Sequence, residues 1–144
     1  PFRTKYLLTV LGELLEAIFL KMFFLFFLGI PSSPLNAKTP FLNASTAQLS
    51  WKKPQNTGGR SDILYDVICL FNGKDCGSKV HFYPKSKRLN IPSVFVSGLL
   101  PFKKYTFRVF ATNGVSKFSA VKPKYLDVPV ITKESRKYNK LYIY

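Results

Sequence analysis

Cysteine and histidine are scarce in this 144-residue chain, which has two Cys and one His. Cys69, Cys76 and His81 are too few for a structural zinc site with four protein ligands. Acidic residues are scarce as well, since seven Asp or Glu stand against 22 Lys or Arg. The sequence pairs no nucleophile with a base, so we expect neither catalytic activity nor a cofactor.

The sequence also lacks the motifs of protein kinases and of RNA-binding domains. The sequence contains no glycine-rich phosphate loop with its strand lysine and no His-Arg-Asp catalytic loop, which excludes a kinase domain from this chain. It contains no cluster of interleaved aromatic and basic residues of the RNA-binding kind. We therefore expect no nucleic-acid partner.

The excess of basic residues gives the chain a formal net charge of +15. Residues 31–134 alone contain 16 Lys or Arg and 5 Asp or Glu, a net charge of +11. One interpretation is that outward lysines keep a β-sheet protein soluble and protect its edges. The other is an acidic partner such as a sulfated glycan or an anionic lipid. The basic residues expected to serve it are Lys85, Lys87 and Arg88, and less directly Lys103 and Lys104.

An apolar segment precedes residue 31 and differs in pattern from the rest of the chain. Residues 7–30 are mostly apolar but carry Glu13, Glu16 and Lys21, and charges near the centre of a spanning helix are costly. Three interpretations of residues 1–30 stay open. They are a membrane helix, a signal peptide without a clear cleavage site, or non-coding sequence carried into the reading frame. Under the membrane-helix interpretation, the chain would associate with a membrane through residues 7–30.

The two ends of the chain suggest a fragment. The sequence begins with Pro1 rather than Met, so we expect it to be part of a longer protein. Residues 135–144 have no periodic pattern, and we expect them to form an unstructured tail outside the domain.

From residue 31 to residue 134 the hydrophobic pattern has period two, as half-buried strands require. His81 alternates with Val80 and Phe82 in one short run. Turn signals built from Gly, Pro and Asn separate the runs, and no ten-residue stretch shows a helical stripe. Short strands at this spacing predict a single all-β, antiparallel sandwich. The other runs lie at residues 47–51, 63–70, 94–96, 105–112 and 128–132.

Several aromatic and proline positions identify the kind of sandwich. Trp51 ends the expected second strand, and its indole is large enough to fill the centre between two sheets. Leu99-x-Pro101-x-x-x-Tyr105 has the form of a corner in which the tyrosine hydroxyl bonds back to the chain upstream. This combination resembles the fibronectin type III family. The resemblance implies a seven-stranded, immunoglobulin-like module over residues 31–134.

Loop motifs give a closer resemblance. They are Gly58-Gly59-Arg60-x-Asp62 before the strand at 63–70, and Asn113-Gly114-Val-Ser after the strand at 105–112. With a cysteine at the end of the earlier strand, they resemble the first fibronectin type III repeat of the Eph receptors, the tyrosine kinases that bind ephrins. The paired glycines are first of all turn residues that allow positive φ angles, and contact with a partner is the second interpretation of this loop.

The same resemblance implies two covalent features. The family's repeat commonly carries four cysteines in this region, and the present chain keeps only the outer two, so Cys69 and Cys76 are expected to form a disulfide. The alternative is two free thiols, with Cys69 on the core face. Asn43-Ala44-Ser45 is an N-glycosylation sequon, which is meaningful if the module is secreted.

The resemblance also implies a function. We expect a non-catalytic, extracellular module of a cell-surface receptor, acting as a spacer and contacting proteins such as neighbouring receptor domains or a lateral receptor. No ephrin-contacting residue is carried over, because the family's ligand-binding domain is a different one. The alternative is a stand-alone module, secreted or anchored by its N-terminal segment, that binds a protein or an acidic glycan.

Overall fold

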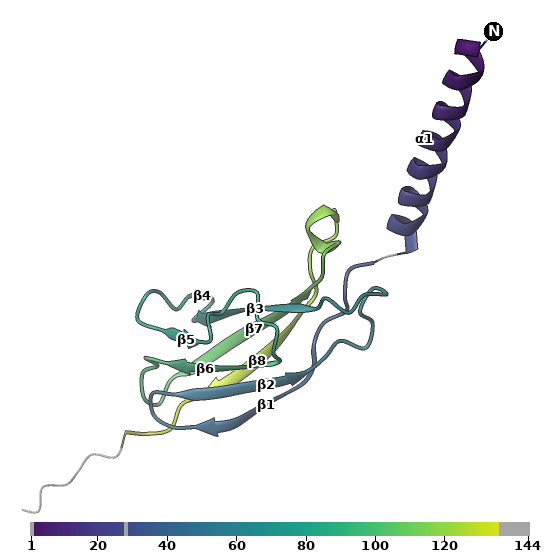
Figure 1. The fold of residues 1–144 in the computed structure, drawn as a ribbon. Coiled ribbons are helices and arrows are strands. Elements are labelled where there is room, and N and C mark those ends of the chain that lie inside the picture. The colour runs from purple at the N-terminus through teal and green to yellow at the C-terminus, as the bar shows by residue number, and fades with distance from the viewer. Residues whose placement is uncertain (1, 28, 136–144) are drawn as a thin grey trace, which may run out of the picture.

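Two antiparallel sheets pack face to face in this computed structural model, which describes residues 2–27 and 29–135 (Figure 1). One sheet has the strand order β1-β2-β6-β5 and the other β4-β3-β7-β8. A long helix, α1 (Phe2–Phe27), precedes them. The strands are β1 (Leu35–Leu42), β2 (Ala47–Lys52), β3 (Leu64–Phe71), β4 (Lys74–Asp75), β5 (His81–Tyr83), β6 (Ser93–Ser97), β7 (Lys104–Thr112) and β8 (Tyr125–Ile131), with a 3₁₀ turn η1 (Ser116–Phe118) before β8.

The alternating pattern of the sequence produces this sandwich. In β2, β3 and β7 every second side chain is buried, because successive side chains of a strand point to opposite faces of the sheet. The inward side chains of both sheets form one core, in which Leu49, Phe107 and Val109 are fully buried. The predicted all-β fold with antiparallel strands is confirmed.

The strand count differs slightly from the expected seven, since the described part of the chain has eight. The Asn72-Gly73 turn folds β4 back onto β3, where Leu70 pairs with Asp75 and Phe71 with Lys74.

Strand β1 showed no alternation in the sequence, and the structure gives the reason. Its register against β2 shifts twice, between Leu35 and Lys38 and again before Phe41, so its side chains do not alternate between core and solvent.

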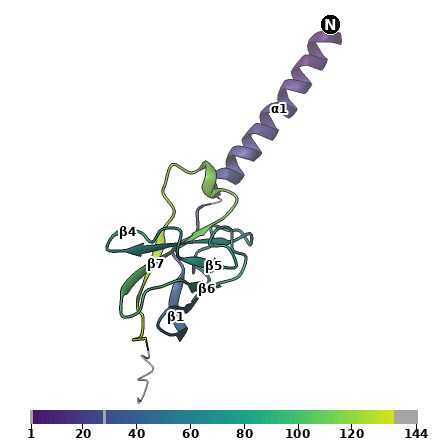
Figure 2. The same ribbon diagram turned by 90° about the vertical axis from the view of Figure 1, so that its left-hand side faces the viewer.

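Helix α1 stands apart from the sandwich in both views (Figures 1 and 2). The side chains of residues 6–22 are exposed, and every residue of the hydrophobic core cluster lies between Ala47 and Val130. The sandwich therefore buries its core without α1. Within residues 2–27 and 29–135, no helical stretch combines the length with the hydropathy that crossing a bilayer requires.

The chain enters the sandwich through a short extended segment that is fixed to it. Pro31 and Pro34 are fully buried. The amide of Ser32 donates to the carbonyl of Asn56 at 2.8 Å, and the amide of Gly29 donates to the carbonyl of Gly58 at 3.2 Å. The segment before β1 is thus held against the loop between β2 and β3. The predicted tail at 135–144 lies outside the described residues except for Ser135.

Candidate interaction site at the entry end of the sandwich

The two loop motifs of the sequence meet at the end where the chain enters. Gly58 and Gly59 both have positive φ, +68° and +73°, which favours glycine because it lacks a Cβ. A Cβ on Gly58 would also collide with the backbone carbonyl of Gly29. These glycines therefore shape the loop between β2 and β3 so that it can lie against the entry segment.

Arg60 and Asp62 join this loop to the loop that follows β7. The guanidinium of Arg60 donates from Nε and one terminal nitrogen to the two carboxylate oxygens of Asp62, at 2.7 and 2.8 Å. The amide of Gly114 donates to the same carboxylate at 3.0 Å. The hydrogen bond from Arg60 is the main cause that lowers the pKa of Asp62 from 3.8 to about 2. Asp62 is thus a bridge between two loops, rather than only half of a local ion pair.

Asn113 is the centre of the site. Its side-chain amide donates to the carbonyls of Gly29 and Thr57, at 2.9 and 3.1 Å. Its side-chain oxygen accepts from the amides of Val115 and Ser116 at 3.1 Å each, and from the Ser116 hydroxyl. Asn113 is 7% exposed, so a buried carboxamide uses both of its ends to tie three segments together.

A groove of about 730 Å³ runs beside this loop cluster. Its walls include charges of both signs, from Asp62, Asp66, Arg88 and Lys117. Asp66 already accepts from the amide of Arg88 at 2.7 Å. No group of three or more His, Cys, Asp or Glu capable of holding a metal ion gathers among the residues described by the structure. The groove thus places charges of both signs beside Asn113 and Gly114.

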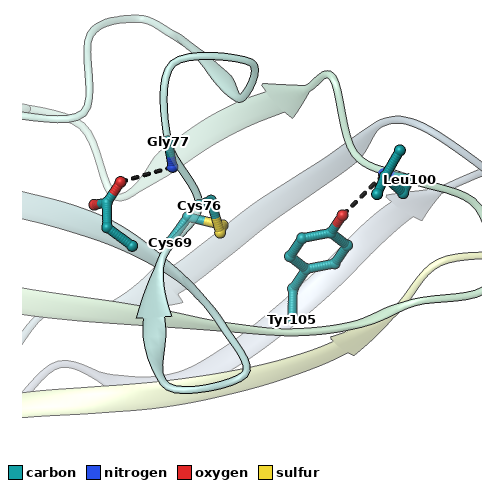
Figure 3. Close-up of a disulfide and its surroundings, with 6 residues drawn as sticks. Cys69, Cys76, Gly77, Leu100 and Tyr105 are labelled. Atoms are coloured by element: carbon teal, nitrogen blue, oxygen red, sulfur yellow. Dashed lines mark hydrogen bonds between the residues drawn. A yellow bond between two sulfur atoms is a disulfide. The ribbon is translucent and has the colours of Figure 1, made fainter.

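The opposite end of β3 and β7 carries the disulfide and the tyrosine corner (Figure 3). Cys69 and Cys76 are joined with their Cα atoms 5.4 Å apart, and Asp75 accepts from the amide of Gly77 in the turn beyond. The hydroxyl of Tyr105 accepts from the amide of Leu100 at 2.9 Å. The rings of Phe71 and Tyr105 lie 5.2 Å apart and connect the two features.

The remaining signature residues divide between core and surface. Trp51 and Leu99 are buried, and Trp51 lies edge-on to Tyr65 with ring centroids 5.4 Å apart. Pro101 is exposed in the turn ahead of β7. Asn43 is exposed, and its side-chain oxygen accepts from the amides of Ser45 and Thr46 at 2.8 and 2.6 Å. Trp51 lies near the end of β2, towards the entry end of the sandwich, whereas Asn43 lies in the turn between β1 and β2 at the opposite end.

The basic residues proposed for an acidic partner form two separate exposed groups. Lys85, Lys87 and Arg88 follow β5, while Lys103 precedes β7 and Lys104 is its first residue. A further group of lysines and exposed apolar residues, at 117–124, was not predicted as a site from the sequence. Its signal was the run Lys117-Phe118 to Lys124, which lacks acidic residues.

Comparison with known proteins agrees with this geometry. The sequence profile of the fibronectin type III domain matches residues 32–123. Chicken ephrin type-B receptor 2 is 34% identical over 112 residues, which cover 74% of this chain and 11% of the receptor. Human ephrin type-A receptor 1 is 43% identical over 99 residues, covering 61% of this chain and 10% of that receptor. The chain thus spans about a tenth of these relatives, and the predicted likeness to Eph receptors is confirmed.

Solved structures support the fold. The fibronectin type III domain of human fibronectin type III domain containing protein 3 has a TM-score of 0.54 at 22% identity, covering 78% of this chain and 94% of that one. Domains d3–d4 of the rat CD45 extracellular region have a TM-score of 0.55 at 16% identity, covering 72% of this chain and 51% of that one. From its fold and the match over residues 32–123, this chain belongs to the fibronectin type III domain family.

Proposed function

We propose that the sandwich is a non-catalytic, extracellular module of an Eph-like cell-surface receptor, where it acts as a stiff spacer and as a contact surface for other protein domains. The observation that carries this proposal is the set of hydrogen bonds made by Asn113. They fix the entry segment and two loops into one unit, so that the direction in which the chain enters the module is defined. A spacer needs a fixed connection of this kind, because a flexible linker would not hold a preceding domain in place.

The likeness to ephrin type-A and type-B receptors supports the cell-surface context. The disulfide agrees with it, because disulfides persist in oxidising compartments. The loop motifs support assignment to the first repeat of such receptors. The groove beside Asp62 and Lys117, with charges of both signs, supports the role in protein contact.

A chimaeric receptor tests this proposal. In chicken ephrin type-B receptor 2, the matching segment would be replaced with residues 29–135 of this chain, or with an unrelated fibronectin type III domain as the control. We expect the chimaera with residues 29–135 to reach the cell surface and to respond to ephrin. A response that only this module preserves indicates specific contacts, and one that both modules preserve indicates a spacer. Retention of the chimaera inside the cell would contradict the proposal.

One observation favours a second candidate, binding of an acidic glycan. Lys85 and Lys87 line a shallow concavity with His81 and Phe82, and both lysines are exposed. Retention on heparin above physiological salt that is lost on Lys85→Gln with Lys87→Gln would support glycan binding. Elution at or below physiological salt would exclude it, because exposed charges are screened beyond about 8 Å at that ionic strength.

A further inference from the structure

The loop formed by η1 and the residues that join it to β8, residues 116–124, projects from the entry end of the sandwich (Figures 1 and 2). Near its tip it exposes two apolar side chains, since Phe118 is 72% and Val121 is 60% exposed. Exposing an aromatic ring and a branched aliphatic side chain so close together in one loop is unfavourable in water. A surface that covers both would remove this cost.

The charge of the loop is of one sign. Residues 114–125 contain Lys117, Lys122 and Lys124 and no Asp or Glu. The ammonium of Lys117 lies 4.7 Å from the centroid of the Phe118 ring, so the positive charge is next to the apolar tip. The expected partner surface is therefore negatively charged and has an apolar layer close beneath it.

The base of the loop is fixed while its tip is exposed. Asn113 holds the amides of Val115 and Ser116, and the amide of Phe118 donates to the carbonyl of Val115 at 2.9 Å in the 3₁₀ turn. A loop whose base is ordered in advance loses less conformational entropy when it binds. The loop is thus built to present Phe118 to a partner, rather than to fold around one.

We propose that residues 116–124 form a membrane-contact loop for an anionic lipid surface. Phe118 and Val121 enter the boundary between headgroups and acyl chains, and the three lysines lie against lipid phosphates and carboxylates. Lysine is depleted in protein–protein interfaces, whereas it is enriched at membrane surfaces, and this difference favours a bilayer over a protein pocket. Helix α1, with its exposed apolar residues, lies at the same end of the sandwich (Figures 1 and 2).

A tryptophan placed at the tip reports on this loop in the full chain. Phe118→Trp adds one exposed indole, while the native Trp51 is 5% exposed and gives a constant background. With vesicles of phosphatidylcholine and phosphatidylserine, we expect a blue-shifted emission that brominated acyl chains quench. With phosphatidylcholine alone we expect neither effect. An emission that stays unshifted with the anionic vesicles, or that shifts equally with both kinds, overturns the proposal.

Cosedimentation with the same vesicles measures the contributions of the loop. The samples are the full chain and residues 29–135, since the sandwich buries its core without α1. In residues 29–135, replacing the three lysines with Gln should weaken binding roughly 100-fold, which is about fivefold for each lysine. Phe118→Asn with Val121→Asn should weaken it at least roughly 10-fold, because the buried apolar area is lost.

The opposite end of the sandwich offers a matched control residue. Phe102 is 68% exposed and is followed by two lysines, but its amide is bound to the carbonyl of Lys133 in the turn ahead of β7. Phe102→Asn should leave vesicle binding unchanged. Equal losses from Phe102→Asn and Phe118→Asn would contradict the assignment to the loop. Binding that needs the lysines but not Phe118, together with the same dependence on heparin, would assign the loop to an acidic glycan and overturn the lipid proposal.

Discussion

The side-chain amide of Asn113 donates to the backbone carbonyl of Gly29 across a sequence separation of 84 residues. The same nitrogen donates to Thr57, which lies 56 residues away. One carboxamide therefore connects the entry segment, the loop after β2 and the loop after β7.

Removing the Asn113 carboxamide should destabilise the module. Asn113→Ala leaves the carbonyls of Gly29 and Thr57 and the amide of Val115 without their partner, and we expect a loss of about 2–3 kcal/mol in the free energy of unfolding. Chemical denaturation measures the loss. The exposed Asn90→Ala serves as the control and should change stability by less than about 0.5 kcal/mol.

Asn113→Asp separates the two ends of the carboxamide. The carboxylate still accepts from the amides of Val115 and Ser116, but it cannot donate to Gly29 and Thr57. We expect faster hydrogen exchange at the Gly29 amide in this variant and little change at Ser116. Equal acceleration at both amides would contradict the division of roles.

Tyr105→Phe removes one hydrogen bond and little else. The hydroxyl of Tyr105 accepts from the amide of Leu100 at 2.9 Å, and the ring itself is buried. We expect a loss of about 1 kcal/mol in the free energy of unfolding and faster exchange of the Leu100 amide. Tyr83 is 79% exposed, so Tyr83→Phe should leave stability unchanged. An equal change in the free energy of unfolding for the two substitutions would contradict a stabilising role for the Tyr105–Leu100 hydrogen bond.

Reducing the Cys69–Cys76 disulfide should lower stability by roughly 2–3 kcal/mol, because the bond closes a short loop in the unfolded chain. Unfolding the wild-type chain with and without reductant measures this. The reductant is preferable to Cys69→Ala, since Cys69 is 3% exposed and its removal would also leave a cavity. Identical unfolding midpoints with and without reductant would contradict the stabilising role.

The Asp62 bridge should depend on pH in a defined window. The pKa of Asp62 is lowered from 3.8 to about 2, so its contribution to stability is complete above about pH 4 and is lost as the pH falls through 2. The NMR shift of the Gly114 amide, which donates to this carboxylate, should titrate with a midpoint near 2. Arg60→Gln removes the main cause of the low pKa and should move this midpoint upward. A midpoint that does not respond to Arg60→Gln would contradict the bridge.

Expression through the secretory pathway tests the sequon. Asn43 is exposed in the turn between β1 and β2, so we expect the full chain to gain one N-linked glycan there. Asn43→Gln and Ser45→Ala should both abolish the mass increase. Asn36→Gln, which lies outside any sequon, is the control. A secreted chain without this mass increase would contradict the prediction that Asn43 is glycosylated.

The sequence by itself determined the sandwich and its membership in the family. Alternation at 47–51 and 105–112 fixes which side chains enter the core, because a strand sends successive side chains to opposite faces. Trp51 and the Leu99-Pro101-Tyr105 spacing then identified the kind of sandwich. Strand β1 could not be located this way, since its bulges remove the alternation.

Tertiary structure decided what lies together at the entry end. The Gly58–Asp62 loop and the Asn113-Gly114 motif were separate local signals in the sequence, and pairing of β3 with β7 brings them into contact. Gly29, at the edge of the apolar segment, carried no signal for its bond with Asn113. Hydrogen bonds between residues this far apart depend on how the sheets close, and local composition does not encode that geometry.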